Sequence, residues 1–201
     1  IRSMASRGHL GGISAATPKV VATLDGLGFP EVFVETVGVG QAEVEIAGNA
    51  DTTLVVVNPG WGDSVQAAKA GLLEIGDIFV VNKADRPGVE DTVRDLRTML
   101  TMGPERSWMP PIVTTVAVTG DGVGELWRAV MDHRAHLEAG GALEDGRRDR
   151  RRGELEVALA GVFSRRAAAL IDDPGGRSIV DAVERGDLDP WSAAEDIAAR
   201  S

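Results

Sequence analysis

A short apolar run, Ile78-Phe79-Val80-Val81, ends directly in the polar residues Asn82-Lys83-Ala84-Asp85. An apolar run of this length that contains β-branched residues is typical of a buried strand in a parallel sheet. In open α/β sheets, ligands bind in the crevice at the carboxyl ends of the strands. The sequence therefore predicts that these four polar residues lie at the edge of a sheet where a ligand would bind.

The pattern Asn-Lys-x-Asp is typical of domains that read guanine. The carboxylate of Asp85 can accept hydrogen bonds from a ring N–H and an exocyclic amine, the side chain of Asn82 can reach the other edge of the base, and the stem of Lys83 can cover the ring face. Adenine offers no matching pair of donors to a carboxylate, so the pattern favours guanine. The alternative is a polar strand end that caps the next helix.

The rest of the chain continues the alternation of strands and helices that indicates an α/β fold with a parallel sheet. Apolar runs predict further strands at residues 32–34, 53–57 and 112–116. Apolar spacing predicts helices that start at Thr17-Pro18 with the Thr17 hydroxyl as cap, near residues 44–47, after Asp63 or Ser64, over residues 88–102, and after residues 120–122.

Composition excludes several classes of partner. The chain has 31 acidic and 21 basic side chains and a net charge of -10, which is a poor match for nucleic acid. No apolar stretch approaches the roughly 18 residues that a membrane span needs, so we expect no membrane partner. The chain contains no cysteine, which fits a reducing compartment, and we expect a cytoplasmic location.

The last third of the chain differs in composition from the rest. Gly140-Gly141 marks a break, an arginine-rich run follows at 147–152, and apolar positions predict a helix from Leu155 onward and two shorter helices after it. This tail has too few residues for a core of its own, so its apolar face must pack on the main domain or on another chain. We therefore expect a main domain at 1–140, a helical arm at 141–201, and a homodimer.

Two further patterns support a nucleotide site. Glu35-Thr36-Val37-Gly38 stands at the end of a predicted strand, where an acidic side chain can approach Mg²⁺ through water and a glycine N–H can reach a terminal phosphate. Residues 115–122 follow the last predicted strand and resemble the remaining guanine-contacting loop of GTP-binding domains, in which a backbone N–H at the position of Ala117 faces the base oxygen. The alternative for Glu35 is a solvated side chain in a glycine-rich connection.

His133 and His136 lie three residues apart on a predicted helix. This spacing can bind a metal, but no acidic residue is expected to converge on the pair, so we interpret both as structural. Trp127, on the same helix, is expected to pack in the core.

Three stretches of the chain resemble the MeaB/ArgK family, G-proteins that escort adenosylcobalamin-dependent methylmalonyl-CoA mutase. They are residues 1–12, residues 34–41, and the run from Asp63 to Asp85. The resemblance covers nearly the whole chain, including the tail, which forms a dimerisation arm in the family. It implies a P-loop NTPase-type sheet, GTP and Mg²⁺ as ligands, and GTP hydrolysis coupled to protecting the mutase and gating its cofactor loading.

The resemblance also implies roles for individual residues. The guanine base would be bound by Asn82, Lys83 and Asp85, with Val116, Ala117 and Val118 closing over its edge, and the Mg²⁺ and γ-phosphate side would be served by Glu35 and Gly38. Residues 59–69 resemble a switch segment that touches the mutase, with Lys69 as its functional charge.

The expected turnover is low. Ras-like enzymes carry a water-orienting glutamine directly after the glycine that corresponds to Gly38, where this chain has Val39. Gln41 could assist only if its loop bends back. We therefore expect slow GTP hydrolysis that the partner accelerates.

The phosphate-binding loop of the family pattern is not found in this sequence. A phosphate loop of the type Gly-x-x-Gly-x-Gly-Lys-Ser does not occur, and the chain begins at Ile1. We expect a truncated chain without the first strand and phosphate loop, which by itself would hydrolyse GTP poorly or not at all. Two alternatives remain: a chain that binds the mutase or dimerises without turnover, and an ATP-dependent kinase linked to amino-acid uptake, against which Asp85 argues.

Overall fold

A parallel sheet forms the centre of the first part of the molecule. In a computed structural model of the chain, residues 1–4, 16–36, 48–60, 66–104 and 106–199 are described, except for the side chains of 66–70. The described strands are β1 (Leu54–Val57), β2 (Ile78–Asn82) and β3 (Ile112–Thr115), and they pair in the order β1-β2-β3. Both pairings are parallel, which confirms the predicted fold class.

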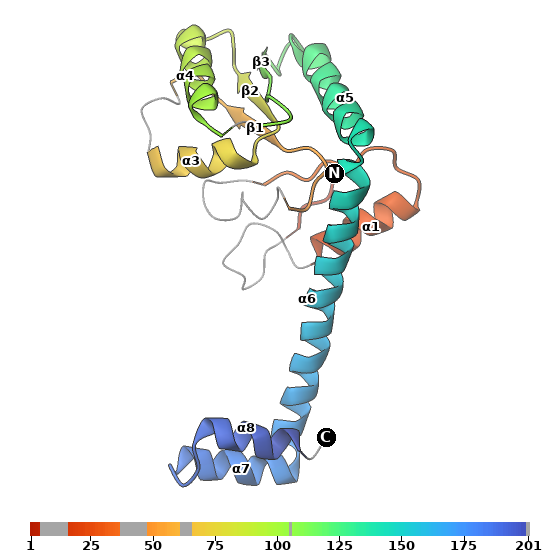
Figure 1. The fold of residues 1–201 in the computed structure, drawn as a ribbon, viewed down its shortest axis with the longest axis vertical. Helices are drawn as coiled ribbons and strands as arrows, with labels where there is room; N and C mark the ends of the chain where they lie inside the picture. Colours follow the sequence, from red (N-terminus) through yellow and green to blue (C-terminus); the bar gives the residue numbers. More distant parts are fainter. Residues whose placement is uncertain (5–15, 37–47, 61–65, 105, 200–201) are drawn as a thin grey trace. The chain divides into compact units, whose positions relative to one another are not determined.

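Helices connect the strands and cover both faces of the sheet. The helix α3 (Gln66–Ile75) lies between β1 and β2 in the chain, α4 (Val89–Met102) lies between β2 and β3, and α5 (Val123–Ala139) follows β3. Figure 1 shows α4 on one side of the sheet and α5 on the other. The predicted helices that correspond to α3, α4 and α5 are therefore confirmed.

Two apolar clusters hold these layers together. On the α3 and α4 side, the buried residues are Val55, Val57, Phe79, Val81, Leu96 and Leu100. On the α5 side, they are Ile78, Val80, Val113 and Ala129. Every side chain from Ile78 to Val81 is buried because β2 is the central strand and both of its faces are covered. This is why the sequence of β2 is continuously apolar.

The strand predicted at residues 32–34 does not form. Residues 31–36 are neither helix nor strand in the structure. Phe33 is 75% exposed, and its ring centroid lies 6.5 Å from that of Trp127. Strands are defined by main-chain pairing, and among the described residues this segment has no paired neighbour. The interpretation of Trp127 as a core residue is also wrong, because 39% of it is exposed.

The first helix confirms one prediction and corrects another. The helix α1 (Thr17–Gly26) occupies the predicted position, with Pro18 in its first turn. Its N-cap residue is Ala16, however, and the Thr17 hydroxyl donates to the sulfur of Met4 at 3.9 Å instead of capping the helix. The predicted helix at 44–47 and the predicted caps Asp63 and Ser64 lie outside the described residues.

The long helix α6 (Ala142–Asp172) begins well before Leu155, where the sequence predicted its start. Its first turns contain the arginine-rich run, which suits a helix because Arg has a high helix propensity and pairs with acidic residues one turn away. Examples are Arg148 with Asp145 at 2.9 Å and Arg152 with Glu156 at 3.3 Å. The break itself is confirmed, because α5 ends at Ala139 with Gly140 as its C-cap and Gly141 has a positive φ of 73°.

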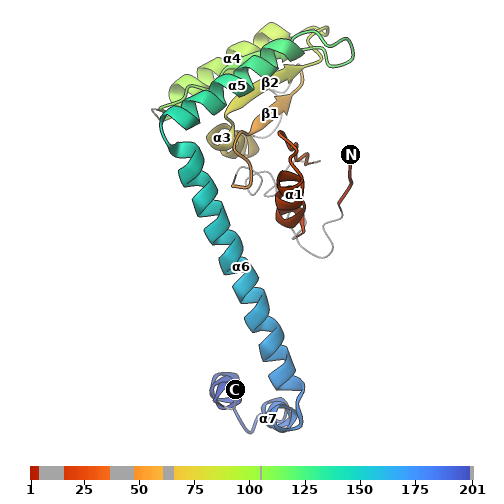
Figure 2. The ribbon, with the colours of Figure 1, turned by 90° about the vertical axis from the view of Figure 1, so that its right-hand side faces the viewer.

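Two short helices complete the chain, α7 (Pro174–Glu184) and α8 (Pro190–Ala198), as predicted. Each begins with an aspartate cap: Asp173 accepts from the N–H of Gly176, and Asp189 accepts from the N–H groups of Trp191 and Ser192. Figure 2 shows α6 leading to α7. No helix in the described ranges has the length and apolar character required for a membrane span.

The chain divides into two compact units, Ile1–Arg150 and Arg151–Ser201. The boundary falls inside α6, so the first unit contains the beginning of that helix. The functional division at residue 140 stays a prediction.

Within the first unit, Asp51 joins the start of α6 to the segment before β1. Its carboxylate accepts from Arg147 at 2.7 Å and from Arg150, and Arg150 also donates to the carbonyl of Ala50 at 3.1 Å. Burial alone would raise the pKa of Asp51, but the hydrogen bonds and charges of the two arginines outweigh it and lower that pKa. Arg147 and Arg150 therefore hold the start of α6 against the segment before β1.

A second polar cluster lies at the opposite edge of the sheet from Asn82, around the buried His133 of α5. Its Nδ1 is hydrogen-bonded to the Thr52 hydroxyl at 2.9 Å, and its Nε2 lies 3.6 Å from Asp77 Oδ1. Asp77 also accepts from the N–H of Thr53 at 2.8 Å, and the Trp108 ring packs against His133 at 5.0 Å. His133 therefore links α5 to the segments that lead into β1 and β2.

Burial lowers the pKa of His133, against the attraction of Asp77, and the neighbouring His136 lowers it further. Burial also raises the pKa of Asp77, although the Thr53 N–H, His133 and Arg106 act in the opposite direction. A histidine whose pKa is lowered by folding stabilises the native state above its unfolded pKa of about 6.5, and this contribution is lost as the pH falls.

We therefore predict that the free energy of unfolding of the wild type decreases relative to that of His133→Gln as the pH falls from about 7 to about 5. The reason is that the unfolded chain takes up a proton at position 133 more readily than the folded chain. Urea denaturation of both proteins across this range measures the difference. A relative gain in wild-type stability on acidification would contradict the prediction and indicate a dominant His133–Asp77 ion pair.

Candidate functional site

The ends of β2 and β3 are joined by the side chain of Asn82. Asn82 is the last residue of β2 and is paired in register with Thr115, the last residue of β3. The Oδ1 atom of Asn82 accepts a hydrogen bond from the Thr115 hydroxyl at 3.2 Å and another from the backbone N–H of Ala117 at 3.1 Å. Two of the predicted site residues, Asn82 and Ala117, are therefore in direct contact.

A tight turn follows Asn82 and presents Asp85. The N–H of Arg86 donates to the carbonyl of Lys83 at 3.0 Å, and the N–H of Ala84 donates to the carbonyl of Thr115 at 3.0 Å. Lys83 has a φ of 60°, the one positive φ of a non-glycine residue in the described part of the chain. Such a conformation is unfavourable for a side chain with a Cβ and is found disproportionately at functional sites. Asp85 itself is exposed.

The segment after β3 folds into a compact loop beside this turn. The N–H of Val116 donates to the carbonyl of Asp121 at 2.9 Å, and the N–H of Gly120 donates back to the carbonyl of Val116 at 2.9 Å. The Thr119 hydroxyl adds a hydrogen bond to the carboxylate of Asp121 at 2.7 Å. These bonds fix the backbone at 116–121 and leave Val118 96% exposed at its tip.

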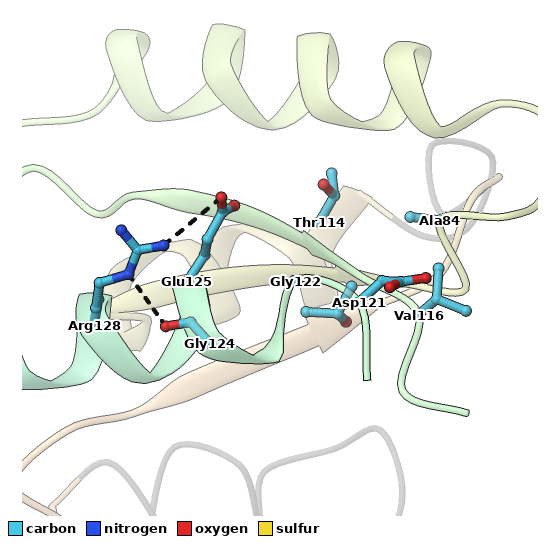
Figure 3. A pocket seen from close by; sticks show the side chains of 9 residues that line it. Ala84, Thr114, Val116, Asp121, Gly122, Gly124, Glu125 and Arg128 are labelled. Atoms are coloured by element: carbon cyan, nitrogen blue, oxygen red, sulfur yellow. Dashed lines mark hydrogen bonds and ion pairs between the residues drawn. The ribbon is translucent and has the colours of Figure 1, made fainter. Parts of the chain in front are cut away.

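An open hollow of about 380 Å³ lies next to this loop (Figure 3). Its wall includes Ala84, Val116 and Asp121, and it extends along α5 to Glu125 and Arg128. In Figure 3 the Arg128 guanidinium is directed toward Glu125, from which it lies 3.9 Å. Lys83, Asp85 and Ala117 are not among its lining residues. The hollow is therefore adjacent to the predicted base-binding residues and does not coincide with them.

The structure does not bring the other predicted site residues into contact with Asn82 or the loop at 116–121. Glu35 lies in the irregular segment 31–36 and is exposed. Gly38 and Gln41 lie outside the described residues, and Lys69 belongs to α3, but its side chain is not described. In the described ranges, no group of three or more His, Asp or Glu side chains forms a potential metal site.

Two residues that the sequence did not single out support the site. Thr115 is 4% exposed and contacts Asn82 with its side chain and Ala84 with its carbonyl. Gly122 has a φ of 76°, and a Cβ there would lie 2.0 Å from the carbonyl oxygen of Thr114. The sequence carried a signal for Thr115, since it ends the strand next to the one that Asn82 ends.

The parallel sheet covered by helices, with polar loops at the ends of β2 and β3, is that of an α/β protein of the nucleotide-binding type. Residues 1–170 match the family described as Methylmalonyl Co-A mutase-associated GTPase MeaB. The chain belongs to this family of GTPases.

Individual relatives agree with this assignment. A Pyrococcus horikoshii protein named as a GTPase is 47% identical over 199 residues, which are 97% of this chain and 62% of the relative. The Escherichia coli protein named GTPase ArgK is 34% identical over 157 residues, or 73% of this chain and 46% of that protein. A mouse protein named Methylmalonic aciduria type A homolog, mitochondrial, is 30% identical over 148 residues, or 71% of this chain and 36% of that protein.

A solved structure described as LAO/AO transport system kinase shares the fold, with a TM-score of 0.61, 23% identity, and coverage of 90% of this chain and 60% of that one. The chain thus spans about three fifths of the length of the Pyrococcus horikoshii relative and of this solved chain.

We predict that Gly122→Ala lowers the free energy of unfolding by about 2 kcal/mol or more, because alanine disfavours the positive φ of this position and its Cβ would also collide with the carbonyl of Thr114. Gly120→Ala is the matched control, since Gly120 has a φ of 86° and no atom lies within 4 Å of the place that its Cβ would occupy. It should cost only about 1 kcal/mol. Equal losses in chemical denaturation would show that the contact with Thr114 is unimportant.

Proposed function

We propose that the protein binds and hydrolyses GTP and that the turn at 82–85 and the loop at 116–118 read the guanine base. The observation that carries this proposal is the contact of Asn82 with Thr115 and Ala117, which holds both loops together at the carboxyl edge of the sheet. Membership of the MeaB family of GTPases supports it independently. Because the chain covers only part of its relatives' length, nucleotide binding is tested on the complete natural polypeptide that carries this sequence.

Each side chain has a distinct part in base recognition. The exposed carboxylate of Asp85 accepts from the two donors on the amine edge of guanine, and the stem of Lys83 covers one face of the ring. Adenine has no such pair of donors and leaves the carboxylate with unpaired acceptors. Val116, Ala117 and Val118 form the backbone that closes over the remaining edge of the base.

The phosphate side involves Glu35 and Gly38. An exposed carboxylate suits Mg²⁺, which prefers oxygen ligands and keeps part of its hydration shell, so Glu35 would hold the ion through water. Bound Mg²⁺ would neutralise phosphate charge. The N–H of Gly38 would reach the γ-phosphate, and Gln41 and Lys69 belong to the segments that would respond to the nucleotide and to a partner.

We predict that Asp85→Asn weakens binding of GDP by at least about tenfold and strengthens binding of xanthosine diphosphate. The amide offers one donor and one acceptor, which matches the carbonyl that xanthine carries in place of the guanine amine. Titration with fluorescent nucleotide analogues measures both affinities, with Asp95→Asn on the exposed surface of α4 as control. Unchanged preference for guanosine over xanthosine nucleotides, or preference of the wild type for ATP, would contradict the proposal.

The family description also supports a partner, because it names an association with methylmalonyl-CoA mutase. We propose that the protein protects the adenosylcobalamin-dependent mutase and gates its cofactor loading. If nucleotide recognition drives this action, protection of the mutase from inactivation should depend on GTP for the wild type and on xanthosine triphosphate for Asp85→Asn. Protection that does not depend on nucleotide would favour a binding role without turnover.

We further propose that the second unit forms a homodimer contact. Leu155, Leu159 and Phe163 are 66%, 50% and 56% exposed and are spaced four residues apart, so they form one stripe along α6. Trp191 on α8 is 80% exposed. Burying a large apolar side chain contributes about 1.5–3 kcal/mol. Association of two copies of this chain through the stripe would therefore be favourable.

We predict that Leu159→Glu weakens the dimer by at least about tenfold, because it places a charge in the centre of the buried stripe. Val157→Glu is the matched control: Val157 is 74% exposed on the same helix but lies about 200° around its axis from Leu159. Sedimentation velocity at several protein concentrations measures both. A monomeric wild type, or equal effects of the two substitutions, would contradict this interface.

A further inference from the structure

We infer that Thr92 is a positioning residue that fixes the turn carrying Asp85 to the loop that leaves β1. Thr92 lies in the first turn of α4 and is 3% exposed, and no part of the site described above uses its buried hydroxyl. The inference rests on the proposed function for its consequence in nucleotide binding. The contact itself is a feature of the fold.

The Thr92 hydroxyl joins two segments of the chain. The N–H of Gly60, in the loop after β1, lies 3.2 Å from Thr92 Oγ1 and can only donate. The hydroxyl proton is therefore left for the carbonyl of Gly88, the N-cap residue of α4, at 3.1 Å. Because the hydroxyl accepts one hydrogen bond and donates the other, each bond polarises and strengthens its neighbour.

Two glycines allow these segments to approach each other. Gly60 has a φ of 85° and Gly88 a φ of 90°, conformations that residues with a Cβ adopt at a cost. A Cβ at position 88 would lie 3.9 Å from the Cβ of Pro59 and 4.0 Å from the nitrogen of Gly60. The backbone at Gly88 therefore packs closely beside the loop after β1, and the Thr92 hydroxyl bridges the two.

The connection from Gly88 back to Asp85 is short and stiff. Arg86 and Pro87 are the two residues between them. The N–H of Arg86 closes the turn by donating to the carbonyl of Lys83 at 3.0 Å, and the ring of Pro87 fixes its own φ. A displacement of Gly88 would therefore be passed on to the carboxylate of Asp85.

The turn is thus held at both of its ends. Its incoming end is bound to β3, because the N–H of Ala84 donates to the carbonyl of Thr115 at 3.0 Å. Its outgoing end reaches Gly88, where α4 begins without a side-chain cap and where the hydroxyl of Thr92 makes its contact. A carboxylate in a turn that is fixed at both ends is preorganised for a ligand and loses less conformational freedom on binding.

A second threonine of α4 provides a matched comparison. The Thr98 hydroxyl donates to the carbonyl of Arg94, four residues earlier, at 2.9 Å, as the Thr92 hydroxyl does to Gly88. Thr98 is exposed, and this bond lies within its own helix. Removing the Thr98 hydroxyl therefore measures the loss of a local helix bond, and the difference from Thr92 isolates the contact with Gly60.

The first test needs no nucleotide. It compares Thr92→Val, which removes the hydroxyl, with Thr92→Ser, which keeps it, and with Thr98→Val, all in the complete natural polypeptide. At equal global stability, the N–H groups of Gly60 and Arg86 should exchange with deuterium at least about threefold faster in Thr92→Val than in the wild type. Both rates should stay within about twofold of the wild type in Thr92→Ser and Thr98→Val.

The pattern of exchange decides whether the turn is positioned. Unchanged rates in Thr92→Val, or faster exchange at Gly60 without faster exchange at Arg86, would overturn the inference. The same acceleration in Thr98→Val would also overturn it, because the effect would then come from the helix and not from the contact between the segments.

The second test compares GDP with inosine diphosphate, which lacks the amine that Asp85 would bind. The wild type should bind GDP about tenfold or more tightly than inosine diphosphate, and this ratio should fall at least about threefold in Thr92→Val but not in Thr92→Ser or Thr98→Val. A general loss of stability would weaken both ligands alike. An unchanged ratio in Thr92→Val would therefore overturn the positioning of Asp85.

The two tests separate this inference from the proposed function. Faster exchange at Gly60 and Arg86 in Thr92→Val, together with a wild type that binds no guanine nucleotide, would overturn the proposed function and leave the anchoring of the turn by Thr92 supported.

Discussion

The structure of the site depends on one acceptor atom, Oδ1 of Asn82, which takes two hydrogen bonds from the neighbouring strand end and its loop. Parallel pairing of β2 and β3 brings Asn82 opposite Thr115, and the amide then links the two loops that leave the sheet at this point. Without this link, the turn at 83–86 and the loop at 116–121 would be separate surface loops. With it, they form one surface on a rigid scaffold, as a specific ligand site requires.

The sheet supplies the rigidity on which this arrangement relies. Ile78 and Phe79 in the central strand have no exposed surface, and apolar clusters fill both faces. The polar residues appear only where β2 ends, beyond the reach of those clusters. Lys83 turns the chain sharply there with a positive φ, a conformation that costs about 1 kcal/mol and that the surrounding hydrogen bonds must overcome.

The sequence was sufficient to predict the elements that the core defines. Residues 54–57, 78–82 and 112–115 are strands because their apolar character is continuous or nearly so, and this property is local. It failed at residues 32–34, where the composition is similar but a strand also requires a paired neighbour. It also failed at the start of α6, because the helix was predicted only from the apolar positions that begin at Leu155, although the arginine-rich run before them favours a helix.

The candidate site was predictable only in part. The Asn-Lys-x-Asp pattern marked Asn82 and Asp85, but the contribution of Thr115 depends on the register between β2 and β3, which pairs it with a residue 33 positions away in the sequence. Likewise, the need for glycine at position 122 follows from the approach of Thr114, which only the folded loop reveals. Long-range register and close backbone approach are properties of the three-dimensional structure, so a local pattern cannot specify them.

Asp51 illustrates a different consequence of the fold. Its carboxylate lies between the guanidinium groups of Arg147 and Arg150, so two positive charges share one negative charge at the root of α6. If the aspartate alone were lost, Arg150 would lose the ion partner that it has among the described residues and Arg147 would keep only the longer contact of 3.8 Å with Glu144, whereas loss of all three groups would leave no charge to repel. Natural variation at this joint should therefore be concerted, with neutral residues appearing at position 51 mainly in chains that have already replaced at least one of the arginines.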